Sequence, residues 1–92
     1  MKLQKCKLIF ATKGILSVQQ IANILNLIKP FSVEDHQQAN ERLIIYCSFY
    51  NEITADEIND LIPSLGYAEC ISVSEIDVHT AYEYILKLGG IK

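Results

Sequence analysis

The chain has 92 residues, which is enough for one small domain with a single hydrophobic core and too few for two. Half of the residues are hydrophobic and 21% are charged, a composition that argues against a disordered chain and favours a folded domain over residues 1–92. A net charge of −3 also argues against a nucleic-acid-binding protein, because phosphate-binding surfaces need clustered cations.

The first thirteen residues contain only four consecutive apolar residues, at positions 8–11. This run is shorter than the hydrophobic region of a signal peptide or a membrane span, so we expect no membrane insertion and a cytoplasmic location. The three cysteines, Cys6, Cys47 and Cys70, are odd in number and form no CxxC pair. They fit reduced, partly buried thiols better than a disulfide framework.

The first two predicted elements are a strand and a helix. Residues 7–12 are apolar and rich in strand formers, and Gly14 ends them. Ser17 is a good helix N-cap with Gln20 three residues later, as in a capping box, and apolar residues then repeat with helical period as far as Ile28. Pro30 ends this helix, because the residue before a proline avoids helical geometry.

The middle of the chain predicts two strands. Residues 31–37 are expected to form a polar second strand, with a turn at residues 38–41. Residues 43–50 predict a third strand that is apolar on both alternating sets of side chains. Both faces of this strand should therefore be covered.

The last part of the chain predicts a helix, a strand and a further helix. Thr54 and Glu57 form a second capping box, and helical spacing continues to Leu65, with Pro63 expected to loosen the last turn. Residues 68–76 read as the fourth strand. Residues 80–88 predict a third helix, which the glycines at 89 and 90 end.

This order of elements is the β-α-β-β-α-β pattern of ferredoxin-like domains. We predict an α+β sandwich with a four-stranded antiparallel sheet, a core of residues 7–75 and a helical C-terminal extension over residues 79–92. Two helices cover one face of such a sheet and leave the other face open. Because the third strand is apolar on both faces, we expect the helix at 80–88 or another subunit to cover the open face.

Residues 14–21 read Gly-Ile-Leu-Ser-Val-Gln-Gln-Ile. This segment resembles the metal-binding loop of the heavy-metal-associated domain family, which includes small copper chaperones and modules of P-type metal-transporting ATPases. The family's loop is Gly-Met-x-Cys-x-x-Cys followed by an apolar residue, and Gly14, Ile15 and Ile21 are in register with it. Residues 54–67, which end in Leu-Gly-Tyr at Tyr67, resemble the family's second helix and closing turn. The resemblance covers about residues 7–75 and implies the ferredoxin-like fold.

The two metal-ligand positions of the family hold Ser17 and Gln20 in this chain. In the family, two thiolates near a helix N-terminus hold Cu(I) or Zn. A serine hydroxyl stays protonated near neutral pH, and an amide oxygen is a poor ligand for a soft metal. We therefore interpret Ser17 and Gln20 as capping residues that stabilise the helix by about 1 kcal/mol. Together with Gly14 and Tyr67 they mark a lost metal site, and we expect no cofactor.

The other soft-metal candidates are Cys6, Cys47 and Cys70. We expect Cys47 on the parallel neighbour of the first strand and Cys70 at the start of its antiparallel neighbour, so that Cys6 and Cys70 lie more than about 10 Å apart. Metal ligands need closer convergence. His36 and His79 have no paired ligand one helical turn away.

These features favour a non-enzymatic domain that has lost its metal site and acts in protein–protein interaction or regulation. The expected contact surface is the open face of the sheet and the C-terminal helix, with Tyr82, Tyr84, Ile85 and Leu88 as anchors. The expected partner is another protein or a second copy of the chain.

Three alternatives stay open at this point. The first is a copper or zinc carrier with non-standard ligands, such as cysteines shared across a dimer. The second is a small ferredoxin-like ribonuclease, although that family carries an Asp at the end of the first strand, where this chain has Thr12 and Lys13. The third is a regulatory domain that binds a small ligand at the sheet edge or at a dimer interface.

Overall fold

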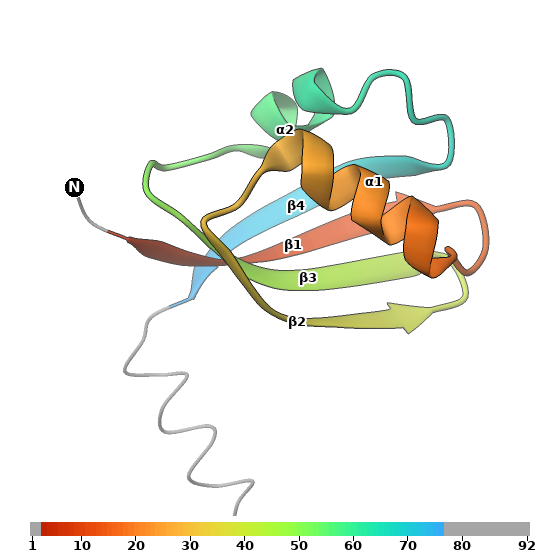
Figure 1. Cartoon of the computed structure of the whole chain (residues 1–92), viewed down its shortest axis with the longest axis horizontal. Coiled ribbons are helices and arrows are strands. Elements are labelled where there is room, and N and C mark those ends of the chain that lie inside the picture. Colours follow the sequence, from red (N-terminus) through yellow and green to blue (C-terminus); the bar gives the residue numbers. More distant parts are fainter. Residues whose placement is uncertain (1–2, 77–92) are drawn as a thin grey trace, which may run out of the picture.

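The computed structural model describes residues 3–76, which form four strands and two helices. The elements are β1 (Gln4–Thr12), α1 (Val18–Ile28), β2 (Ser32–Ala39), β3 (Arg42–Phe49), α2 (Ala55–Leu61) and β4 (Ala68–Ile76). The sheet has the order β2-β3-β1-β4 with every neighbouring pair antiparallel, and both helices lie on one side of it (Figure 1). The predicted α+β ferredoxin-like fold is confirmed.

Several predicted boundaries differ from the structure. β1 begins three residues earlier than predicted, and β2 continues through residues that were assigned to a turn. The predicted helix at 80–88, and with it the extension at 79–92, lies outside the described residues. Neither helix in the described part of the chain is long and apolar enough to cross a membrane.

α2 ends at Leu61 rather than at the predicted Leu65. Ile62 leaves helical geometry at φ −121° and ψ 31°, and its N–H donates to Asn59 O at 3.3 Å. Pro63 follows directly and cannot donate to a helical hydrogen bond, so it stops the helix rather than loosening its last turn. Ile62 nevertheless remains buried, because the turn that follows keeps it against the core.

The expectation that β3 lies parallel to β1 is wrong, because the two strands pair antiparallel with Cys6 opposite Cys47. In the split β-α-β arrangement the parallel pair is β1 and β2, and β3 lies between them. β4 is antiparallel to β1 on its other side, as predicted.

The core lies between the helices and one face of the sheet. Alternate residues of the two central strands point into it, because successive side chains of a strand face opposite sides. These residues are Cys6, Leu8, Phe10, Leu43, Ile45 and Cys47, and all are buried. α1 contributes Ile21, Ile24 and Ile28 at helical spacing, and α2 contributes Ile58.

A two-point hydrogen bond joins α2 to β4. Asn59 Nδ2 donates to Cys70 O at 2.8 Å, and Cys70 N donates to Asn59 Oδ1 at 2.8 Å. Cys70 lies beside a register shift in the β1–β4 ladder, between Ile9 and Phe10 on the β1 side. The side chain of Asn59 thus completes backbone pairing next to the irregularity.

We expect Asn59→Ala to lower the free energy of unfolding by about 2 kcal/mol, because it leaves the partly buried N–H and C=O of Cys70 without these partners. Urea unfolding followed by circular dichroism measures this change. Asp60→Ala is the matched control on the exposed side of the same helix and should change stability by less than about 0.5 kcal/mol. Equal losses for the two variants would contradict the assigned role.

Candidate functional site

The two residues at the family's ligand positions bond to each other's backbone. Ser17 Oγ accepts from Gln20 N at 3.2 Å, and Gln20 Oε1 accepts from Ser17 N at 2.8 Å. Ser17 has the extended backbone of an N-cap, with φ −72° and ψ 165°. The predicted capping box is confirmed, and both side chains cap the helix.

The loop that carries these residues is held by more distant parts of the chain. Leu16 N donates to Gln38 Oε1 at 2.8 Å, and Gln38 Nε2 donates to Leu16 O at 3.1 Å. Tyr67 Oη donates to Gln20 O at 3.3 Å, so the predicted marker Tyr67 does contact the loop. These bonds, from Gln38 on β2 and from Tyr67 just before β4, hold the loop in place.

Gly14 lies at the turn that enters the loop. Its φ of 77° is in the left-handed region, where a residue with a side chain is strained. Thr12 Oγ1, at the end of β1, donates to Gly14 O at 2.8 Å. Thr12 therefore braces the turn at the position where the ribonuclease alternative needs a carboxylate.

The three cysteines do not converge in the described structure. Cys6 and Cys47 are directly opposed on β1 and β3, but Cys70 is opposite Phe10, four residues further along β1. Four residues of strand correspond to roughly 13 Å. Among residues 3–76 no three His, Cys, Asp or Glu side chains come together as a metal site, and His79 is outside that range.

All three thiols are buried, and burial shifts their acid–base chemistry. It raises the pKa of Cys47 to about 12, with a further contribution from neighbouring Cys6. Burial also raises the pKa of Cys6 and of Cys70 above the ordinary thiol value. A metal binds the thiolate, so protonated thiols in the core are poor ligands.

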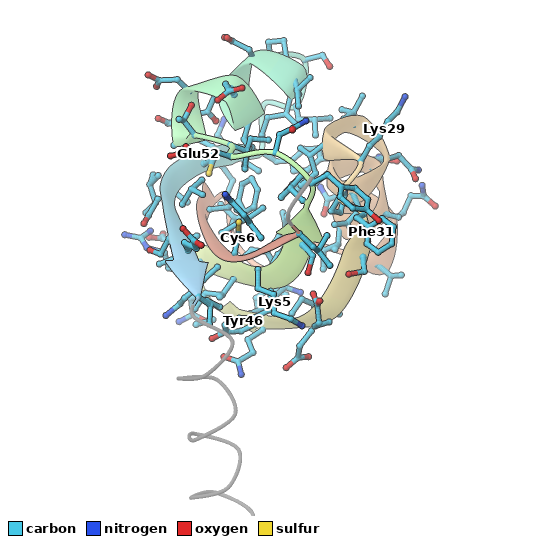
Figure 2. The ribbon with its side chains drawn as sticks, turned by 90° about the vertical axis from the view of Figure 1, so that its left-hand side faces the viewer. Lys5, Cys6, Lys29, Phe31, Tyr46 and Glu52 are labelled. Carbon is cyan, nitrogen blue, oxygen red and sulfur yellow. The ribbon has the colours of Figure 1, made fainter. Side chains whose placement is uncertain are left out.

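The face of the sheet away from the helices carries the other set of alternating residues. On β1 these are Lys5, Lys7, Ile9 and Ala11, and on β3 they are Arg42, Ile44, Tyr46 and Ser48. Figure 2 shows Lys5 and Tyr46 on this side. Ile9, Ile44 and Tyr46 remain partly exposed, so this face has an apolar centre that is not fully buried.

Glu34 lies at one end of this open face. It is the extra residue of an irregularity in the β2–β3 ladder, between Val33 and Asp35. Ser48 Oγ, Ser32 Oγ and Lys5 Nζ donate to Glu34 Oε1 at 2.8, 3.2 and 3.3 Å. Partial burial acts to raise the pKa of the Glu34 carboxyl, but the hydrogen bonds from Ser48 and Lys5 outweigh it, and the pKa is lowered.

A cavity of about 320 Å³ opens at the end of the molecule where α1 stops, and the sequence did not predict it. Its lining comes from the end of α1, the α1–β2 connection, the end of β3, the β3–α2 connection and Glu57. Phe31 and Tyr50 meet edge to face with ring centroids 4.6 Å apart. Figure 2 shows Lys29 and Phe31 on one side and Glu52 on the other. The volume is at the lower limit for small-molecule sites.

The anchors Tyr82, Tyr84, Ile85 and Leu88 lie outside the described residues, and their predicted role stays a prediction. Within the described part, hydrogen bonds join Ser17 to Gln20 and Gln20 to Tyr67, and Gly14 lies at the turn that enters the same loop. That these positions are the remnant of a metal site stays a prediction.

No family model matches the sequence, and no curated protein matches it significantly. The strand order and connections define the class as a small ferredoxin-like α+β domain. The likeness to heavy-metal-associated domains rests on the residues of the loop and of the α2 region alone.

We expect Glu34→Gln to reduce the pH dependence of stability. A carboxyl whose pKa is lower in the folded state stabilises the fold at pH values above its ordinary pKa near 4.5. This contribution is lost as the pH falls through the folded-state pKa. The variant should therefore be less stable than the wild type at pH 7 and approach it in acid, as measured by urea unfolding over this pH range. Glu41→Gln, at an exposed turn, is the control. A constant difference between Glu34→Gln and wild type at all pH values would contradict the assignment.

Proposed function

We propose that this chain is a non-enzymatic ferredoxin-like domain that keeps the scaffold of a heavy-metal-associated domain, has lost its metal site and acts by protein–protein contact. The capping box supports the loss of the metal site, because the side-chain oxygens of Ser17 and Gln20 accept hydrogen bonds from each other's backbone N–H groups. A loop held by Gln38 and Tyr67 needs no ion to keep its shape.

The composition of the open face supports a role in protein–protein contact. Ile9, Ile44 and Tyr46 provide an accessible apolar centre, and Lys7 and Asp35 stand beside it. An apolar centre with an aromatic residue and a charged border is the usual composition of a protein interface.

A copper or zinc carrier is the second candidate, because Cys6 and Cys47 are directly opposed across β1 and β3. Two thiolates suffice for Cu(I). Against it stand the burial of both side chains and their raised pKa values, which a metal would have to overcome by displacing protons in the core.

Titration with Cu(I) under reducing conditions, against a colorimetric Cu(I) chelator, tests the loss of the metal site. We expect the wild type to take up no stoichiometric Cu(I). Ser17→Cys combined with Gln20→Cys restores two thiols next to a helix N-terminus and should bind one equivalent. Ser17→Ala with Gln20→Ala is the matched control, since it also removes the capping box, at about 1 kcal/mol, but adds no ligand.

Stoichiometric binding by the wild type that is lost in Cys6→Ser or Cys47→Ser would instead establish the carrier. No binding by the double-cysteine variant, with its fold intact by circular dichroism, would contradict the likeness of this loop to a metal-binding loop.

A further inference from the structure

We infer that the open face of the sheet binds a second copy of the same chain, face to face. This inference rests on the proposed function, because it names the partner for the contact surface. Its basis is the register of the four strands, which arranges the open-face side chains in rows across the sheet. The charges in these rows are self-complementary.

The central row is apolar. It runs from Gln37 on β2 through Ile44 and Ile9 to Ser72 on β4. We place a two-fold axis in the plane of the interface, over the middle of this row. Whether the axis runs parallel or perpendicular to the strands, the isoleucines of one copy then meet those of the other. Two facing sheets interlock their side chains at about 10 Å separation.

The two flanking rows carry the charges. One runs Asp35, Tyr46, Lys7, Ser74, and the other runs Ala39, Arg42, Ala11, Glu69. Each row has one cation on a central strand and one anion on an edge strand. The order is reversed between the rows, because the anion of the first row is on β2 and the anion of the second row is on β4.

With the two-fold axis parallel to the strands, β1 of one copy lies over β3 of the other. Lys7 then faces Tyr46 of the second copy and stands next to its Asp35, so that the ammonium contacts both a ring face and a carboxylate. Arg42 faces the small Ala11 of the second copy and reaches its Glu69. Every charge of the flanking rows gains an opposite charge.

With the axis perpendicular to the strands, the two flanking rows exchange. Arg42 then lies over Tyr46 of the second copy and beside its Asp35, and Lys7 reaches its Glu69. Cations again meet anions. The self-complementarity therefore belongs to the pattern of charges, and the two orientations differ in which pairs form.

The remaining charges at this end of the face are already neutralised. Lys5 pairs with Glu34 within one copy at 3.3 Å. Among residues 3–76, the second copy thus meets an apolar centre and two balanced rows, with no unmatched charge in these rows to desolvate. A foreign partner would have to reproduce this alternation of charges, whereas a second copy has it by symmetry.

The area of the face places the interface in the small, weak class. Four strands about 4.8 Å apart, each with about eight residues at 3.3 Å, cover roughly 500 Å² in plan. Stable dimers bury about 800 Å² per partner, so this dimer should be weak, with a dissociation constant in about the micromolar range.

Sedimentation velocity of the full chain across and above the micromolar range is the first test, and we expect a reversible monomer–dimer equilibrium. Ile44→Asp places a charge in the apolar centre and should weaken the dimer about tenfold or more. Val18→Asp, at a residue 85% exposed beside the loop, is the matched control and should leave the equilibrium unchanged. Circular dichroism checks that each variant is folded.

Charge reversal identifies the axis. Lys7→Glu and Asp35→Lys should each dimerise more weakly alone, because each brings like charges together in its own homodimer. If the axis is parallel to the strands, mixing these two variants restores all pairs, and a heterodimer of wild-type affinity forms. If it is perpendicular, restoration requires mixing Lys7→Glu with Glu69→Lys.

A folded chain that stays monomeric at high concentration would overturn the inference, as would a dimer insensitive to Ile44→Asp and to every charge reversal. Neither result bears on the loss of the metal site, which the Cu(I) titration decides separately. A monomer would leave contact with a different protein as the remaining form of the proposed function.

Discussion

β1 is the strand on which the rest of the structure depends. It hydrogen-bonds to β3 on one side and to β4 on the other, and its side chains alternate between the two faces of the sheet. Leu8 and Phe10 face the helices and are fully buried, while Lys7 and Ile9 face away. A slip of one residue would expose the core set and bury a lysine, so the register is strongly specified.

The same strand leads into the loop, and the loop keeps its shape through local capping and two long-range contacts. In a metal-binding loop the ion contributes to folding, because ligands converge only in the folded state. Here Gln38 binds the Leu16 N–H and C=O, and Tyr67 binds Gln20 O. Protein hydrogen bonds thus hold this loop in place, and they join it to β2 and to the residue before β4.

Features encoded by neighbouring residues could be predicted from the sequence. Both capping boxes join residues three apart, so Ser17 with Gln20 and Thr54 with Glu57 were visible as patterns. The order of elements followed from hydrophobic periodicity and gave the fold. The Leu16–Gln38 contact spans 22 residues and depends on where β2 lies, so no local sequence pattern could predict it.

The cavity and the pairing of the cysteines were missed for a related reason. Phe31 and Tyr50 meet only because β2 and β3 are neighbours, and their contact requires the fold before it can be inferred. Cys6 and Cys47 oppose each other because β3 pairs antiparallel with β1 in this register, and both the direction and the register follow only from the fold. The predicted separation of Cys6 from Cys70 was sound, since it depended only on the position of each along its strand.

The irregularity at Glu34 connects the electrostatics of the open face to its register. In a regular ladder without this irregularity, Glu34 would stand opposite Tyr46 and Asp35 opposite Ile45, which places the Asp35 carboxylate on the helix side of the sheet beside the core. With it, Asp35 returns to the open face next to Tyr46, and Glu34 is free to accept from Lys5 and Ser48. One inserted residue therefore keeps an acid away from the core, neutralises Lys5 and sets the position of the anion that a second copy would need to meet Lys7 or Arg42.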